Sequence, residues 1–248
     1  MMEKSAQPIP QVNESGSTTP SDEAQRAYTG VRTDIVEMIP PSVQKVLDVG
    51  CSNGTLGGYL KTLSATRQVY GAEAVADFCS TARRHLDRVE QVDLNQQLIG
   101  AVYPGECFDC VVFGDVLEHL VSPEKQLQSV REVLAPDAYV VVSMPNIRHL
   151  SAFVSIFLKG HFPRRERGLF DKTHLRWYTL SDAIRLLEAC GFVKESVTYS
   201  LRIGDRGDGF LNKVLRKLFG RVAHWFIFRE FFCYQYCIRA RMVPVEVP

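Results

Sequence analysis

The chain has 248 residues, of which 46% are hydrophobic, and its formal net charge is +1. This length and composition suit one domain with a sizeable core, and the near-zero charge gives no global field toward nucleic acid, so no nucleic-acid partner is expected. The seven cysteines are an odd number spread through apolar stretches, which argues against a disulfide framework and for a reducing, cytoplasmic compartment.

Residues 1–24 are polar and rich in Pro, Ser and Thr, and we expect a disordered tail with no secretory signal or membrane anchor. A single domain should occupy residues 25–248. The periodicity of the hydrophobic residues and the positions of helix-breaking residues predict helices at 27–40, 55–64, 74–87, 124–134 and 180–192, the last with Ser181 as its N-cap. They predict strands at 45–50, 67–73, 89–95, 108–115, 138–145, 193–200 and 231–241.

Strands that alternate with helices indicate a mostly parallel sheet with helices on both faces. Such sheets bind ligands at the carboxyl ends of their strands, near the point where the strand order switches. The turn between Gly50 and Gly54 follows the first predicted strand, and its spacing alone fits either a cofactor cradle or a plain tight turn. Acidic residues at or near the ends of three successive strands favour the cradle: Asp48, Glu73 and Asp93.

Each of these acids has a specific use and a simpler alternative. Asp48 interrupts an apolar strand, where a buried carboxylate is costly unless it is hydrogen-bonded. Glu73 follows the glycine turn at the distance expected of a ribose-binding acid, although a solvated loop glutamate would look the same. Asp93 could bind an adenine amino group or be a turn aspartate. Acids near the turn repel a pyrophosphate, so they favour a cofactor with a sulfonium and an amino group.

Four stretches together resemble class I S-adenosylmethionine-dependent methyltransferases over roughly residues 28–192 and, more loosely, the final strand. They are VLDVGCSNG, VYGAE, FDCVVFGDVLEHL and VREVLAPDAYVVVSMPN. Ser52 replaces the middle glycine of the family's first motif, and Pro136-Asp137-Ala138 replaces a glycine pair. The stretches GDVLEHL, SMPN and GLFDKTHLRWYT are similar to the subgroup of the ubiquinone-pathway and sugar or natural-product O-methyltransferases.

The resemblance implies a Rossmann-like, mostly parallel seven-stranded α/β sheet and S-adenosyl-L-methionine as the cofactor. It also implies which positions contact that cofactor, in the strand-end loops and on the leading helix. These are Tyr28, Arg32, Asp48, Gly50, Cys51, Gly54, Glu73, Ala74, Asp93, Leu94, Gly114 and Asp115. For Tyr28 and Arg32 the alternative is ordinary packing and solvation on the helix face.

Methyl transfer to a hydroxyl needs an aligned acceptor and a base that works near neutral pH. His119 is the candidate general base, with capping or packing of its loop as the alternative, and Glu118 could orient it or bind a metal. We expect no metal. Residues that could line the acceptor pocket are Asn146, Arg148, His149, His174, Arg176 and Trp177. The loop that carries the last three could instead be purely structural, with Asp171 paired to Arg176.

Residues 209–229, within an insertion at about 205–230, have the spacing of a basic amphipathic helix. Docking on a membrane surface would suit a lipid-linked acceptor, and a cap over the site or a homodimer face are the alternatives. The leading hypothesis is an O-methyltransferase of a small-molecule, sugar or lipid-linked acceptor. The competing hypotheses are a non-catalytic cofactor-fold protein that binds a partner or membrane through this helix, and a nucleotide-dependent oxidoreductase.

Overall fold

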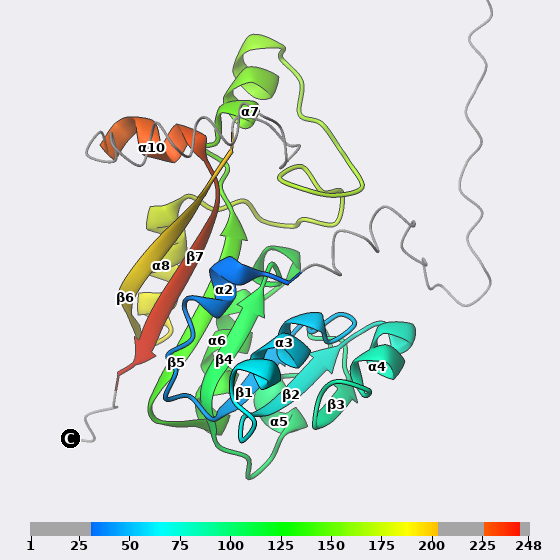
Figure 1. Cartoon of the computed structure of the whole chain (residues 1–248). Helices are drawn as coiled ribbons and strands as arrows, with labels where there is room; N and C mark the ends of the chain where they lie inside the picture. Colours follow the sequence, from blue (N-terminus) through cyan, green and yellow to red (C-terminus); the bar gives the residue numbers. More distant parts are fainter. Residues whose placement is uncertain (1–30, 203–225, 244–248) are drawn as a thin grey trace, which may run out of the picture.

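Seven strands form one sheet in the computed structural model of the chain, which describes residues 31–202 and 226–243. Their order across the sheet is β3-β2-β1-β4-β5-β7-β6, and β7 alone runs antiparallel to both of its neighbours (Figure 1). The strands are β1 (Lys45–Val49), β2 (Gln68–Glu73), β3 (Arg88–Gln91), β4 (Phe108–Gly114), β5 (Leu134–Pro145), β6 (Phe192–Leu201) and β7 (Cys233–Met242). The mostly parallel, seven-stranded α/β prediction is confirmed.

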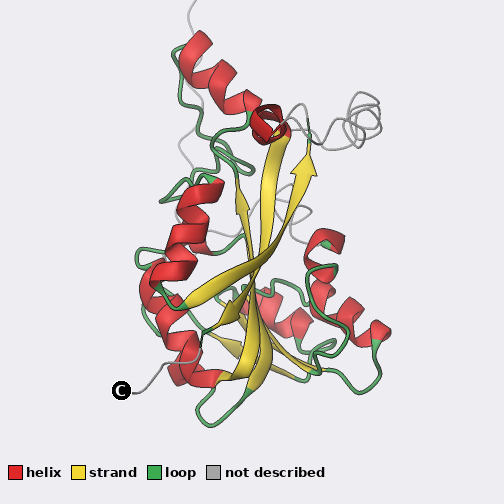
Figure 2. Ribbon diagram, turned by 90° about the vertical axis from the view of Figure 1, so that its left-hand side faces the viewer, coloured by secondary structure: helices red, strands yellow, loops and turns green. Residues whose placement is uncertain are grey.

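Helices cover both faces of the sheet (Figure 2). They are α2 (Thr33–Val36), α3 (Thr55–Leu63), α4 (Ala76–Ala82), α5 (Ile99–Val102), α6 (Pro123–Val130), α7 (Leu150–Phe153), α8 (Leu180–Ala189) and α10 (Phe226–Phe232). Short 3-10 turns span Leu117–His119 and Arg131–Val133, and a π-helical turn spans Val154–Leu158. The segments α7 and α10 lie beyond the carboxyl end of β5 (Figure 1).

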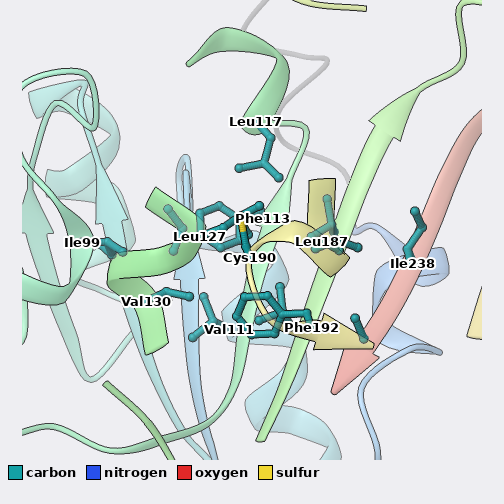
Figure 3. Close-up of a cluster of buried hydrophobic side chains, with 14 of the residues drawn as sticks. Ile99, Val111, Phe113, Leu117, Leu127, Val130, Leu187, Cys190, Phe192 and Ile238 are labelled. Carbon is teal, nitrogen blue, oxygen red and sulfur yellow. The ribbon is translucent and has the colours of Figure 1, made fainter. Parts of the chain in front are cut away.

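The two faces have separate apolar cores because successive strand residues point to opposite sides of the sheet. In β4, Val111 and Phe113 belong to the core under α5, α6 and α8, which also holds Leu127 and Leu187 (Figure 3). Their neighbour Val112 belongs to the other core, under α2, α3 and α4. Burial on both faces is why these central strands read as continuous apolar runs in the sequence.

Several predicted boundaries differ from the observed ones. Helix α8 is capped by Thr179, whose side chain accepts a hydrogen bond from the Asp182 amide and whose own amide bonds the Asp182 carboxylate, so the Ser181 cap prediction is wrong. Strand β5 begins at Leu134 and includes Pro136, at a point where its register against β4 shifts. A proline lacks the amide proton that a regular ladder needs, and an irregular position tolerates it.

Other predictions fall on residues outside the described ranges. These are the tail at 1–24, Tyr28 and most of the 209–229 amphipathic segment, of which only the end lies in α10. Among the helices within residues 31–202 and 226–243, none has both the length and the apolar character that crossing a membrane requires.

Candidate active site

A cavity of about 310 Å³ opens at the carboxyl ends of β1, β2 and β4. The chain passes from β1 to β2 on one side and later returns to β4 on the other, so β1 and β4 form the switch point of the sheet. Ligands of open α/β sheets bind at that position. The cavity wall consists of Gly50, Ser52, Ala72, Glu73, Ala74, Val75, Phe78, Val92, Asp93, Leu94, Asn95, Gly114, Asp115, Val116, His119, Leu120 and Thr173.

The turn after β1 is held in a conformation that favours glycine. Gly50 and Gly54 have φ of 74° and 80°, and Ser52 between them has φ of 49°. A Cβ on Gly50 would lie 2.5 Å from Cγ2 of Val116, and one on Gly54 would lie 2.9 Å from Cα of Ala82. The serine therefore occupies a left-handed position that glycine would adopt without strain. Its hydroxyl oxygen is buried and has no hydrogen-bond partner within the described residues.

Glu73 ties the ends of β1 and β2 together. One carboxylate oxygen accepts a hydrogen bond from the amide of Ser52 (2.9 Å), and the other accepts from the amides of Ala74 and Val75 (2.9 Å each). The side chain is thus fixed on the cavity wall and is not the solvated loop glutamate considered above. These three amides use three of about four lone-pair sites, which leaves one on the oxygen that bonds Ser52.

Asp93 and Leu94 follow β3 and lie on the same wall. The Asp93 carboxylate accepts from the Asn95 amide (2.9 Å) and from the Gln96 side chain (2.8 Å), which is the geometry of a turn aspartate. Both predicted features therefore occur together: Asp93 shapes a turn, and that turn borders the cavity. Asn95 in turn accepts a hydrogen bond from the Val121 amide (2.8 Å), which links this wall to the loop after β4.

Asp48 lies in β1 with 3% of its surface exposed, below the turn and behind the cavity wall. Burial, together with the nearby charge of Glu73, raises the pKa of its carboxyl to about 7. An aspartate that is half-protonated near neutral pH is costly to ionise, and such groups occur mainly where a ligand or partner uses the charge. Cys51 is also buried behind the wall, where its Sγ would lie 2.6 Å from a Cβ placed on Gly71.

Asp115 is the centre of a polar network at the end of β4. It has φ of 60° and accepts hydrogen bonds from Arg32, Gln235 and the Ser143 hydroxyl, the last at 2.8 Å. Arg32 also bonds Ser143 (2.7 Å) and pairs with Asp34 (2.8 Å). The Arg32 guanidinium thus joins α2 to the sheet, and it is not among the residues that line the cavity.

Glu118, His119 and His174 come together next to the cavity. Each offers a ligand atom, and these atoms all lie within 4.8 Å of one another. The Glu118 side chain is 1% exposed, and neither of its carboxylate oxygens has a hydrogen-bond partner among residues 31–202 and 226–243. Burial raises the pKa of Glu118 well above its ordinary value, and the neighbouring charge of Asp115 adds to this effect. His119 also lies on the cavity wall.

The hydrogen bonds of the two histidines fix which nitrogen carries the proton. The Thr173 hydroxyl donates to Asp171 (2.6 Å), so it accepts from Nδ1 of His119 (3.0 Å). Nδ1 of His174 lies 3.3 Å from the carbonyl oxygen of Leu169, which can only accept. In both rings Nε2 is therefore the nitrogen with the lone pair. Burial lowers the pKa of both imidazoles, so both are neutral at pH 7.

The other residues expected at the acceptor pocket have bonds elsewhere. Asn146 is fully buried and donates to the carbonyl oxygens of Glu230 and Cys233 (2.8 Å each). Arg148 pairs with Glu230, and His149 is buried with Nε2 2.8 Å from the Arg202 carbonyl oxygen. The structure does not bring these three side chains to the cavity.

The loop between the π-helical turn and α8 is anchored by its own polar groups. Arg176 donates to the carbonyl oxygens of Leu120 and Val121, at 3.3 and 2.6 Å, and Trp177 donates to that of Leu169 at 3.1 Å. The expected pair between Asp171 and Arg176 is therefore replaced by these bonds. The anchoring has a consequence for the site, because it holds Thr173 and His174 against Glu118 and His119.

Sequence reasoning missed several cavity residues, of which Thr173 is the most informative. It stands directly before His174, and its hydroxyl is the type of group that orients an imidazole. Asn95 is two residues past Asp93, where an Asx turn places a second polar side chain on the same loop. Val75, Phe78 and Leu120 gave no signal, because an apolar residue in a loop or helix does not reveal which surface it lines.

Residues 23–197 match the family model described as "Methyltransferase domain". Among curated proteins, the mouse mitochondrial ubiquinone biosynthesis O-methyltransferase is 32% identical over 144 residues, which are 56% of this chain and 37% of that protein. The ubiquinone biosynthesis O-methyltransferase of Dinoroseobacter shibae is 28% identical over 151 residues, 59% of each chain. The chain therefore spans well under two thirds of the length of these relatives.

Solved structures share the fold. The magnesium protoporphyrin IX methyltransferase of Synechocystis PCC 6803, determined with bound SAH, superposes with a TM-score of 0.56 over 95% of this chain and 90% of that one, at 15% sequence identity. An S-adenosylmethionine-dependent methyltransferase from Archaeoglobus fulgidus gives 0.56 over 88% and 94%, at 17% identity.

Proposed function

Because the chain belongs to the class I S-adenosylmethionine-dependent methyltransferases, we propose that it transfers a methyl group from this cofactor to a hydroxyl oxygen of a small-molecule acceptor. The observation that carries the proposal is one cavity whose wall contains both the fixed carboxylate of Glu73 and His119, whose Nε2 is unprotonated. The names of the curated relatives support oxygen as the methylated atom.

The residues of the cavity fit the cofactor. The first turn, which borders the cavity, needs glycine at Gly50, where a Cβ would collide with Val116. The unpartnered hydroxyl of Ser52 and the remaining lone-pair site of Glu73 can bond the ribose hydroxyls. Asp93 and Leu94 flank the adenine, since both lie on the wall after β3. The carboxylates around the cavity favour a ligand with positive charge over a pyrophosphate.

When bound, S-adenosylmethionine would supply an activated methyl group on a sulfonium, with the sulfur as the leaving group and the acceptor oxygen as the nucleophile. Gly114, Asp115 and Val116 line the cavity between the cofactor wall and His119, so they border the path between donor and acceptor. Nε2 of His119 takes the proton of the acceptor hydroxyl, and the hydrogen bond from Nδ1 to Thr173 keeps the ring in that tautomer.

The assay uses methyl-labelled cofactor and simple phenols, catechols and aliphatic alcohols as acceptor probes. Transfer of label to oxygen by the full chain, which the variant His119→Ala slows by about 100-fold or more, is the expected result. Titration with S-adenosylhomocysteine in a calorimeter controls for the cofactor site, because His119→Ala should bind it as the wild type does. A folded wild type that binds no S-adenosylhomocysteine would contradict the proposal.

Peripheral membrane contact and a lipid-linked acceptor remain part of the proposal. Phe157 and Leu158, beyond α7, are 73% and 68% exposed and precede the exposed Lys159. Apolar side chains next to cations suit an anionic bilayer surface. Co-sedimentation with phosphatidylglycerol vesicles tests this, and the change Phe157→Ser combined with Leu158→Ser should weaken binding.

A homodimer is a separate prediction, which light scattering of the full chain tests.

A further inference from the structure

A second cavity, of about 300 Å³, lies at the ends of β1 and β2 that are opposite to the candidate active site. Pro41 precedes β1 and Arg67 directly precedes β2, whereas the active-site cavity lies past the carboxyl ends of both strands. The wall of the second cavity consists of Val36, Glu37, Ile39, Pro41, Leu63 and Arg67. We propose that this cavity binds a small monocarboxylate with an apolar body.

Arg67 is a buried cation without a carboxylate partner. Its surface is 5% exposed, and in the described part of the chain no carboxylate oxygen lies within 4.0 Å of its side-chain nitrogens. The side chain instead donates to three backbone carbonyl oxygens, those of Val43 at 3.0 Å, Leu60 at 3.3 Å and Pro41 at 3.4 Å. Buried charges are usually paired, because removing a charge from water is costly unless an opposite charge compensates it. The cavity therefore borders a cation that an anionic ligand would neutralise.

The hydrogen bonds of Arg67 leave donors for such an anion. A guanidinium has five N–H groups, and the three carbonyl bonds use one on each nitrogen. One N–H remains on each of Nη1 and Nη2, which is enough for the two oxygens of one carboxylate. The existing bonds from these two nitrogens, at 3.3 and 3.4 Å, are longer than the usual distance of about 2.9–3.0 Å and so are weak.

The rest of the wall selects the class of anion. Val36, Ile39 and Leu63 are apolar, and Leu63 is 54% exposed, so a hydrocarbon body would remove apolar surface from water. The exposed carboxylate of Glu37 also borders the cavity and repels a second negative charge, which disfavours a phosphate dianion. The volume is at the lower end of the roughly 300–1,000 Å³ that small-molecule sites occupy. A singly charged carboxylate with a short hydrocarbon chain fits these conditions.

A purely structural role for Arg67 is the competing account. Leu60 lies in the last turn of α3, where carbonyl oxygens lack helical amide partners, so Arg67 caps this helix and offsets its partial negative charge. That role explains the carbonyl bonds but requires neither the two remaining N–H groups nor a cavity beside them. Only the ligand site predicts that a carboxylate binds there more tightly than a neutral molecule of the same shape.

Two helices connect the second cavity to the cofactor site. Helix α3 begins at the glycine turn, with Gly54 as its N-cap, and ends at Leu63 on the wall of the second cavity. Helix α2 directly follows Arg32, which bonds Asp115 on the active-site wall, and it ends at Val36 on the second. A ligand in the second cavity should therefore act as an effector that changes cofactor affinity, a consequence that rests on the proposed function.

NMR titration of the isotope-labelled full chain with hexanoate tests the binding site. Hexanoate should bind with a Kd of about 1 mM or tighter and shift the amide signals of Ile39 and Leu63. Hexan-1-ol has the same hydrocarbon chain without the charge, so it should bind about 10-fold more weakly. Shifts confined to other surfaces, or equal affinity for the two probes, would overturn the proposal.

Two wall variants should change hexanoate affinity in opposite directions. Arg67→Gln should weaken binding by about 10-fold or more, because it removes the charged donor. Glu37→Gln should strengthen binding by about 2-fold or more, because it removes a like charge at the wall. Glu188→Gln is the matched control, since this exposed residue lies on α8, over the opposite face of the sheet, and it should change nothing.

The control for folding is far-ultraviolet circular dichroism of each variant. Equal hexanoate affinity in the wild type and both wall variants would overturn the site. If Arg67→Gln does not fold, the exposed position of Glu37 keeps the test available, and a Glu37→Gln variant that binds hexanoate no more tightly than the wild type would overturn the site by itself.

Calorimetry with S-adenosylhomocysteine tests the effector role and separates this proposal from the proposed function. Saturating hexanoate should change S-adenosylhomocysteine affinity by about 5-fold or more, and S-adenosylhomocysteine should change hexanoate affinity by the same factor. Hexanoate binding with unchanged cofactor affinity would refute the effector role and leave the binding site. Hexanoate binding by a folded chain that binds no S-adenosylhomocysteine would refute the methyltransferase proposal and leave the binding site.

Discussion

Replacing Asp48 by asparagine should remove a large part of the pH dependence of stability. Burial raises the pKa of Asp48 to about 7, from an ordinary value of 3.8. In the unfolded chain the same group ionises near its ordinary pKa, so the folded state binds more protons between these values. The contribution of protonated Asp48 to the free energy of unfolding is therefore complete below pH 4 and is lost as the pH rises through the pKa of the folded state. At about 1.4 kcal/mol per pH unit, ionising Asp48 lowers the free energy of unfolding by about 4 kcal/mol at pH 8.

The assay is urea unfolding followed by far-ultraviolet circular dichroism at pH 4.5, 6 and 8. Because other groups titrate in the same range, the informative quantity is the difference between Asp48→Asn and the wild type at each pH. The variant should gain about 3–4 kcal/mol relative to the wild type from pH 4.5 to 8. If the free energies of unfolding of Asp48→Asn and the wild type change in parallel with pH across this range, the pKa of Asp48 is not raised in the folded state.

Three further predictions concern the cavity wall. Glu73→Ala should weaken S-adenosylhomocysteine binding in calorimetry by about 10-fold or more, because it frees three amides and removes a ribose contact; unchanged affinity would exclude that contact. Ser52→Gly should bind the cofactor as the wild type does or better, since glycine fits φ of 49°, whereas Ser52→Trp should not bind it; equal affinities would contradict the placement of this turn. Thr173→Val should lower turnover and shift its pH profile without changing cofactor affinity, because it removes the shorter of the two hydrogen bonds of His119 Nδ1 and leaves the one to the Thr173 carbonyl oxygen; an unshifted profile would count against this role.

The fold was predictable because its signals are local. The central strands are apolar runs, as burial on both faces requires, and the strand–helix alternation fixes the class. The alternating strands at the carboxyl-terminal end were also visible, but the exact start of β7 was not. Phe231 and Phe232 were predicted in the strand and belong to α10, and aromatic residues suit a strand and a partly buried helix end equally. Sequence spacing alone does not distinguish Thr179 from Ser181 as the N-cap of α8. The choice depends on the reciprocal hydrogen bonds between Thr179 and Asp182.

The cofactor end of the site was easier to predict than the acceptor end. Glu73 is the last residue of β2, Gly50 directly follows β1, and Asp93 lies two residues past β3, so topology alone brings them to one edge of the sheet. His174 meets Glu118 through a loop whose path is set by side-chain bonds to backbone carbonyls, such as those of Arg176 to Leu120 and Val121. Sequence spacing carries no record of those bonds. For the same reason Asn146 and His149, which follow β5, were expected at the cavity. Their side chains instead bond backbone carbonyl oxygens and so stabilise the connection between β5 and α7.

The central claim is that this cavity holds S-adenosylmethionine with its reactive end toward His119. A crystal structure of the full chain with S-adenosylhomocysteine tests it most directly. The account predicts the ribose beside Glu73, the adenine between Asp93 and Leu94, and the sulfur nearest the Glu118, His119 and His174 cluster. A bound S-adenosylhomocysteine outside the cavity, or one in it with its adenine toward His119, would contradict the account.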